Sequence, residues 1–262
     1  MKFLIQKVNG EVKHDFAFTL LKAIEFHNWL HKEEVMKVKF LDYIEVSEPD
    51  DIYPLQFKPF HKDYIPIGSV EFVTEFLGHF YGLTPKPINI PNELLSYEFT
   101  KRFVFNGSDK EVVGKKFIKS NDKIKGYADI VDDMFDIPEG NYQISDVISI
   151  DSEWRAFVYQ NRLVGLYNYC GEFTKFPNVG KIKEMIAAYK NAPVAYTLDI
   201  GVCDEHTYAD DIGTVVIECH DFFSCGLYGF ADLAILPYMF QRWIFHYIKG
   251  IEYKKIHKTI TL

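Results

Sequence analysis

Near the C-terminal end of the chain, two strand-like segments carry side chains that suit a divalent cation. Asp199 lies in the apolar segment 195–202, while Glu218 and His220 lie two residues apart at the end of the segment 214–220. Residues two apart in a strand share a face, so we expect Glu218 and His220 to point the same way. Carboxylates on adjacent strands suit Mg²⁺, which takes oxygen ligands together with nucleotide phosphates. The imidazole is a softer ligand, which favours Mn²⁺ or only forms a hydrogen bond.

Ordinary structural roles would also account for these side chains. A lone histidine is often a hydrogen-bonded core residue, and the acids lie near a charged loop that contains Asp204, Glu205, Asp210 and Asp211. The pattern Val-Val-Ile-Glu-Cys-His argues for a function, because it places Glu218 where burial is costly without a partner. The residues alone leave both interpretations open.

Two further segments carry charges that suit a nucleotide. In the lysine-rich segment around Lys116, strand alternation puts Phe117 and Lys119 on one face and Lys116 on the other. Such a lysine can reach a phosphate as a point charge, although lysines on edge strands also deter aggregation. Glu153 and Arg155 share a face by the same alternation. One interpretation is an ordinary surface ion pair. If they lie over a cleft instead, Glu153 could accept hydrogen bonds from ribose hydroxyls and Arg155 could bind phosphate oxygens.

The elements that must position these residues begin with a small α/β unit over roughly the first 80 residues. Hydrophobic periodicity predicts strands at 2–8 and 35–41 and a helix that starts near Asp15, with Asp15 as its N-cap. Ser69 is expected to cap a second amphipathic helix. Prolines crowd the connector that follows, and proline stiffens a linker, so we expect a domain boundary there: Pro85, Pro87 and Pro91.

The residue pattern of the second half of the chain predicts mostly strands. The loop between 203 and 213 is acidic, a turn is expected at Asn161-Arg162, and Pro237 is expected to kink the last helix. The predicted strands cover residues 102–105, 116–119, 144–150, 153–160, 163–169, 195–202 and 214–219, and the predicted helices cover 180–191 and 233–249.

Composition excludes several classes of protein. The chain has 262 residues, 48% of them hydrophobic and 25% charged, which excludes wholesale disorder. Its net charge of −8 argues against nucleic acid as a partner. Four cysteines lack the spacing of a structural zinc site, and no apolar run is long enough for a bilayer, so we expect a cytoplasmic protein without membrane contact. Walker A, GxGxxG, HExxH and GxSxG motifs are absent.

Taken in order, the segments FIKS, VISIDSEWRAFV, LDIGV and VIECHD resemble the ATP-grasp superfamily. The chain is also similar to a small clade of phage and bacterial ATP-grasp proteins, through IPIGSVEFV, the connector PKPINIP, Arg102 and KKFIKSNDKIKG. The resemblance covers about residues 64–230. It implies an α/β protein with two α+β lobes that clasp a nucleotide, preceded by a small α/β domain. The expected domains are 1–90 and 91–262, the latter with lobes at 91–150 and 151–262.

The resemblance also implies roles for individual residues. Lys119, helped by Lys116, would contact the α- and β-phosphates of ATP, and Glu153 would bind ribose. Arg155 would reach a phosphate or an acyl-phosphate, and Arg102 is a candidate for binding the other substrate. The backbone of the hinge would pair with adenine, at Val147, Ile148, Ser149 and Ile150.

For the metal, the resemblance implies that Asp199 and Glu218 hold Mg²⁺. His220 stands where the family usually has Asn, which makes Mn²⁺ a further candidate. The implied reaction is activation of a carboxylate by ATP to an acyl-phosphate, followed by attack of an amine to give an amide, ADP and phosphate. The carboxylate and amine, from an amino acid, peptide or protein tail, are not identified. The alternatives are an ATP-binding regulatory module without ligase activity and a non-enzymatic interaction protein.

Overall fold

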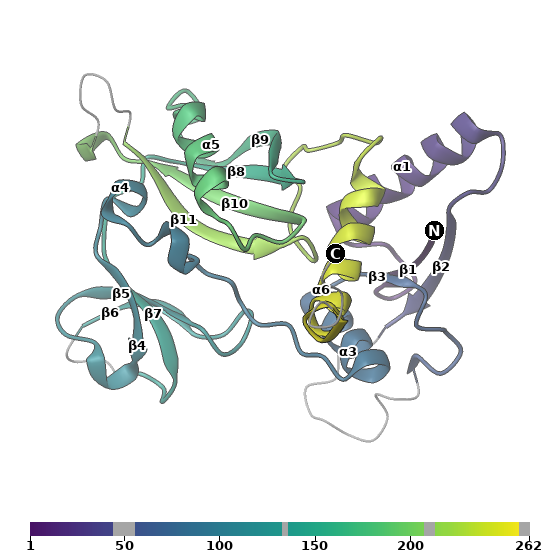
Figure 1. Cartoon of the computed structure of the whole chain (residues 1–262), viewed down its shortest axis with the longest axis horizontal. Coiled ribbons are helices and arrows are strands. Elements are labelled where there is room, and N and C mark those ends of the chain that lie inside the picture. The colour runs from purple at the N-terminus through teal and green to yellow at the C-terminus, as the bar shows by residue number, and fades with distance from the viewer. Residues whose placement is uncertain (44–55, 133–135, 207–212, 257–262) are drawn as a thin grey trace. The chain divides into compact units, whose positions relative to one another are not determined.

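The computed structural model describes residues 1–43, 56–132, 136–206 and 213–256. The chain forms two compact units (Figure 1). The first unit combines Met1–Thr84 and Pro193–Ala195 with Phe222–Leu262, and the second combines Pro85–Ala192 with Tyr196–Asp221. The chain therefore leaves the first unit at the proline-rich connector and returns to it for the C-terminal helix. The expected division into domains 1–90 and 91–262 stays a prediction.

The first unit is built on a three-stranded parallel sheet in the order β2-β1-β3. Its strands are β1 (Lys2–Lys7), β2 (Lys37–Asp42) and β3 (Ile65–Ile67), and its helices are α1 (Asp15–His31), α3 (Val70–Tyr81) and α6 (Leu236–Ile256). The central strand β1 carries a continuous buried run, as parallel strands do when both faces of the sheet are covered. The predicted strand at 2–8 and the small α/β arrangement are confirmed.

Helix boundaries in this unit correct two predictions. The N-cap of α1 is His14, and the Asp15 carboxylate instead accepts hydrogen bonds from the backbone N–H groups of Phe16 and Leu227. Pro237 lies in the first turn of α6, where its missing N–H costs no helical hydrogen bond, so the predicted kink is wrong. The predicted cap of α3 is confirmed, because Ser69 Oγ accepts from the N–H of Phe72. Among the described helices, none combines the length and apolar character needed to cross a membrane.

The second unit contains two four-stranded sheets (Figure 1). The first sheet is antiparallel in the order β4-β7-β5-β6, with β4 (Val104–Ser108), β5 (Lys116–Ser120), β6 (Ala128–Val131) and β7 (Asn141–Asp146). A small core of Ile118, Val131, Tyr142 and Ile144 fills one face of it. Strand β6 was not predicted. Three of its four residues are exposed, so the strand lacks the buried apolar pattern that identifies strands in a sequence. The predicted strand 144–150 is wrong beyond Asp146.

Short helical segments precede and link these strands: η1 (Asn92–Leu94), α4 (Tyr97–Thr100) and η2 (Asp109–Glu111). The connector before them is held to both sheets of the unit. The backbone of Asn89 forms an isolated bridge with Cys219, and the side-chain amide of Gln143 donates to and accepts from the backbone of Ile90. This part of the connector is therefore fixed at the point where the two sheets approach each other.

The second sheet has the order β11-β10-β8-β9. It consists of β8 (Ser152–Tyr159), β9 (Arg162–Gly171), β10 (Ala195–Val202) and β11 (Thr214–Asp221), with η3 (Asp204–His206) between the last two. The β8–β9 turn lies at Gln160 and Asn161, whose φ angles are 51° and 58°, one residue earlier than predicted. Two consecutive left-handed residues are what a tight two-residue hairpin turn requires. The predicted loop acids Asp210 and Asp211 lie outside the described residues.

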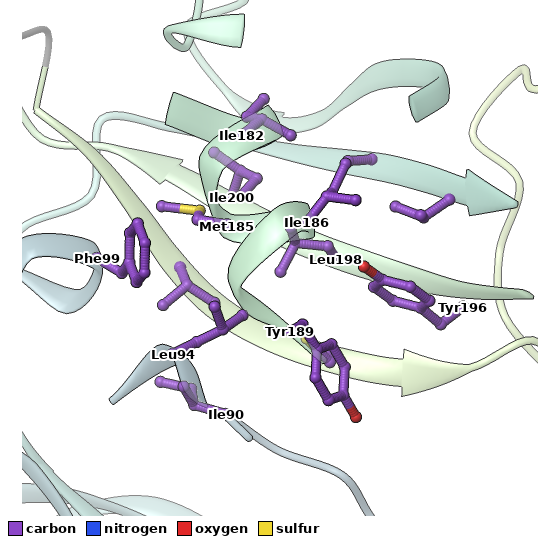
Figure 2. Packing of buried hydrophobic residues seen from close by; sticks show 14 of the residues in the cluster. Ile90, Leu94, Phe99, Ile182, Met185, Ile186, Tyr189, Tyr196, Leu198 and Ile200 are labelled. Atoms are coloured by element: carbon purple, nitrogen blue, oxygen red, sulfur yellow. The ribbon is translucent and has the colours of Figure 1, made fainter. Parts of the chain in front are cut away.

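Helix α5 (Val179–Ala188) covers one face of this sheet (Figure 2). Its residues Ile182, Met185 and Ile186 pack against Leu198 and Ile200 of β10. The core also contains Trp154, Ala156 and Val158, which alternate along β8 with Glu153, Arg155 and Phe157. Because neighbouring residues of a strand point to opposite faces, the polar residues between them lie on the face that α5 leaves uncovered.

Candidate functional site

A buried ion pair forms the centre of that uncovered face. Arg155 of β8 donates from Nε to Asp199 Oδ1 at 2.8 Å and from Nη2 to Asp199 Oδ2 at 2.7 Å. Both residues are almost fully buried, Arg155 at 7% and Asp199 at 1% exposure. A two-pronged contact of this kind fixes the orientation of both groups and is the strongest form of charged hydrogen bond.

Tyr169 joins this pair to Glu153. Its hydroxyl donates to Glu153 Oε2 at 2.6 Å and lies 3.5 Å from Asp199 Oδ2, and the Arg155 guanidinium lies over its ring. Sequence analysis assigned no individual role to Tyr169, which lies at a register shift between Cys170, the partner of Glu153, and Asn168, the partner of Trp154. A bulge of this kind depends on strand pairing and has no signal in the local residue pattern.

Strand β11 brings Glu218 and His220 to the same place. Asp199 and Glu218 are register partners in the antiparallel β10–β11 pair. His220 Nε2 lies 2.7 Å from Glu218 Oε1 and 3.8 Å from Asp199 Oδ2. One ligand atom from each of the three residues lies within 4.8 Å of the others. The residues predicted to bind metal therefore converge, and their two carboxylates and one imidazole form a donor set that fits a divalent cation.

Lys119 reaches this cluster from the other sheet. Its ammonium forms an ion pair with Glu218 Oε2, so β5 and β11 meet through these two side chains. Burial is the largest cause of a lowered Lys119 pKa, to about 8, against a smaller upward effect of Asp199. Burial also lowers the pKa of His220 to about 4, so its imidazole is neutral near pH 7. Of the two side chains, only Lys119 carries charge at that pH.

A cavity of about 70 Å³ opens beside Lys119 and Glu218. Arg102 lines it as well, and its guanidinium donates to the backbone carbonyls of Thr100 and Val216. Burial lowers the pKa of Arg102, yet arginine remains charged at any physiological pH. The remaining lining residues come from the connector and from strands of both sheets: Asn89, Ile90, Phe117, Gln143, Ser145 and Ile217.

The chain matches a known protein family. A family model described as "ATP-grasp domain, R2K clade family 2" matches residues 100–237, more than half of the chain. The chain belongs to this ATP-grasp family. The predicted fold class is thereby confirmed, and the matched residues contain the whole cluster from Arg102 to His220.

Solved structures with the same fold include a D-alanine–D-alanine ligase from Bacillus anthracis. Its complex with ATP is 12% identical to this chain, with 95% of this chain and 99% of that chain covered and a TM-score of 0.51. A second structure of the ligase gives 12% identity, 96% and 99% coverage and a TM-score of 0.50. At this identity the likeness shows the fold alone. No curated protein matches the chain.

Other predicted site residues of this ATP-grasp protein lie outside the cluster. Lys116 is held by Asp146, with Nζ 2.7 Å from Oδ1, and this hydrogen bond is the largest cause of a lowered Asp146 pKa. The expected adenine-binding residues 147–150 form no strand, and the N–H of Ser149 donates to Glu205 at 3.4 Å. Nothing in these positions tests the nucleotide-binding roles of Lys116 and the 147–150 backbone, which stay predictions.

The cysteines differ sharply in access to solvent. Cys170 is exposed, whereas Cys203, Cys219 and Cys225 are buried. Burial raises the pKa of Cys203 to about 12 and that of Cys219 well above its usual value. A thiol reacts through its thiolate, so buried thiols with raised pKa values react slowly.

We therefore expect one of the four cysteines to react rapidly with a thiol reagent such as DTNB in the native protein at pH 8. All four should react after unfolding in guanidinium chloride. Cys170→Ser should remove the fast phase and lower the number of thiols that react after unfolding by one. A second fast thiol, or a fast phase that survives Cys170→Ser, would contradict the burial described above.

Proposed function

We propose that this ATP-grasp protein is an ATP-dependent ligase that joins a carboxylate to an amine. The observation that carries the proposal is the contact of Lys119 with Glu218 across the two sheets, next to Asp199, Arg155 and His220. Lys119, a cation for phosphate, and Glu218, one member of the metal donor set, thus line one cavity, and both lie within the residues matched by the family. A site of this kind works mainly through positioning and electrostatics and requires no nucleophilic side chain.

In this proposal Lys119 offsets phosphate charge, with Lys116 as a second cation. Glu153 binds the ribose, and the backbone of 147–150 pairs with adenine. Asp199 and Glu218, with His220, would hold the divalent cation that the family implies. When bound, that cation neutralises charge that develops on the phosphate oxygens. Arg155 orients the buried Asp199 carboxylate, and Arg102 presents its charge to the cavity where a substrate carboxylate would lie.

The reaction balances without any further reagent. A carboxylate oxygen attacks the γ-phosphorus of ATP, the bond to the β-phosphate oxygen breaks, and ADP leaves. The amine nitrogen then attacks the acyl carbon of the acyl-phosphate, phosphate departs with the electrons of the carbon–oxygen bond, and the nitrogen loses a proton to give the amide. We place the protein in the cytoplasm, because none of its four cysteines forms a disulfide and such thiols are typical of a reducing compartment.

Binding of Mg·ATP is expected to raise the melting temperature. At a concentration about a hundred times its Kd, a ligand stabilises the folded state by roughly 2.7 kcal/mol. For a protein of this size, that corresponds to a shift of about 5–10 °C. The shift should require the metal and disappear in Glu218→Ala, measured on protein whose circular dichroism shows it to be folded. No shift in the folded wild-type protein would contradict the proposal and favour the interaction protein.

A second candidate is an ATP-binding regulatory module without ligase activity. His220 favours it, because an imidazole in the metal cluster changes the donor set on which phosphoryl transfer depends. Release of ADP separates the two functions. A ligase releases ADP from Mg·ATP over many turnovers when a carboxylate and an amine are both supplied, for which mixtures of amino acids and short peptides serve as a first panel. The module gives the thermal shift and no ADP with any mixture.

A further inference from the structure

The metal cluster of this chain mixes two kinds of donor. Asp199 of β10 and Glu218 of β11 supply carboxylate oxygens, and His220 supplies an imidazole nitrogen. Asp199 and Glu218 face each other in register, and His220 lies two residues further along β11 on the same face. The imidazole is consequently built into the cluster by the strand pairing.

The side-chain contacts show that the imidazole faces both carboxylates. His220 Nε2 lies 2.7 Å from Glu218 Oε1 and 3.8 Å from Asp199 Oδ2. A histidine that only filled the core would direct its nitrogens to single backbone or side-chain partners. The register partner of His220 is Thr197, which is fully buried and whose Oγ1 finds no hydrogen-bond partner within the described part of the chain. A further polar oxygen therefore lies beside the imidazole.

The charges around the cluster make donor type more important than net charge. Two cations, Arg155 and Lys119, are paired with the two carboxylates Asp199 and Glu218. The formal charge of these four groups sums to zero, and the nearby carboxylates of Glu153, linked through Tyr169, and of Asp221 add negative charge. Because net charge attracts every dication alike, the strength of the individual metal–ligand bonds decides which ion is held.

Metal ions differ in how they use an imidazole nitrogen. Mg²⁺ demands oxygen ligands, whereas first-row transition ions accept imidazole readily, and their affinity for such sites rises from Mn²⁺ toward Cu²⁺. We propose that His220 makes this site select a divalent transition ion such as Mn²⁺ over Mg²⁺, with His220 Nε2, Asp199 and Glu218 as ligands. This inference rests on the location of the metal site in the proposed function.

The test uses Mn²⁺ alone as the probe, on the full chain without nucleotide. Electron paramagnetic resonance measures the Kd of Mn²⁺ and its displacement by Mg²⁺ in wild type and in His220→Asn, which replaces the imidazole nitrogen with the amide oxygen of a shorter side chain. We expect the wild type to prefer Mn²⁺, and His220→Asn to reduce this preference by about tenfold, the lower end of what a supporting group contributes to a metal site. Pulsed measurements on the wild type should show coupling of Mn²⁺ to an imidazole ¹⁴N.

The pulsed measurement needs no variant, so the proposal stays testable even if His220→Asn does not fold. Imidazole coupling that is lost in His220→Asn supports the assignment. Absence of Mn²⁺ binding, absence of ¹⁴N coupling in the wild type, or equal Mn²⁺ preference in both proteins overturns it. Failure of the proposed function has a different signature: Mn²⁺ binds with imidazole coupling, but neither Mg·ATP nor Mn·ATP changes the melting temperature.

Discussion

Replacing Asp199 with alanine is expected to lower the free energy of unfolding by about 3–5 kcal/mol, the usual cost of removing one partner from a buried ion pair. The Arg155 guanidinium would remain buried and lose two charged hydrogen bonds, of 2.8 and 2.7 Å, at once. Water cannot replace them easily, because Arg155 is 7% exposed. Urea unfolding, followed by tryptophan fluorescence and circular dichroism, measures the change.

A double variant separates the unpaired charge from the lost packing. Arg155→Met combined with Asp199→Leu removes both charges and keeps the volume, and such replacements are often neutral or stabilising. We therefore expect the double variant to regain most of the stability that Asp199→Ala loses, with an unchanged dependence on urea concentration. A loss below about 1 kcal/mol in Asp199→Ala, the range of an exposed ion pair, would show that water reaches the pair.

The strands that form the site could be predicted because their residues carry strong local signals. Residues 195–202 form the strand predicted for them, and every one of them is buried. Alternation placed Glu153 and Arg155 on one face of their strand, and the core holds Trp154, Ala156 and Val158 from the other face. The ordered motifs led to the ATP-grasp fold, which the family match confirms.

Contacts that depend on three-dimensional approach could not be predicted in this way. The Arg155–Asp199 pair joins residues 44 positions apart, and Lys119 meets Glu218 across two separate sheets. Tyr169 contacts Glu153 across the β8–β9 pair, at a register shift that the residue pattern does not reveal. Residues 147–150 were predicted as strand because their residue types favour strands, yet the β5–β7 pairing ends at Asp146, and Val147 is exposed.

The predicted and the observed sites therefore differ mainly in how the charges are paired. Sequence analysis treated Arg155 as a phosphate ligand and Asp199 as a metal ligand, each acting alone. In the structure they bind each other, and Lys119 binds Glu218. Binding of a nucleotide and a cation would therefore have to break these pairs. A phosphate group would replace Glu218 as the partner of Lys119, and the metal cation would replace Lys119 as the partner of Glu218. Such an exchange keeps every charge paired at each step and leaves no buried charge without a partner.

Replacing Lys119 with methionine is expected to raise the Kd for Mg·ATP at least about tenfold, because a charged hydrogen bond to phosphate contributes roughly 1.5–3 kcal/mol. Isothermal titration calorimetry measures the Kd, with Lys110→Met, an exposed lysine of η2, as the matched control that should bind like wild type. An unchanged Kd in Lys119→Met would remove Lys119 from the nucleotide site.

The pH dependence gives this prediction a second, independent readout. Burial lowers the pKa of Lys119 from 10.5 to about 8, so the free protein loses this charge as the pH rises through 8. Because phosphate binds the protonated amine, the affinity of the wild type should fall above pH 8, by up to about tenfold per pH unit. Lys119→Arg keeps its charge throughout this range and should show no such fall. Equal pH profiles in wild type and Lys119→Arg would contradict a role for the Lys119 charge in binding ATP.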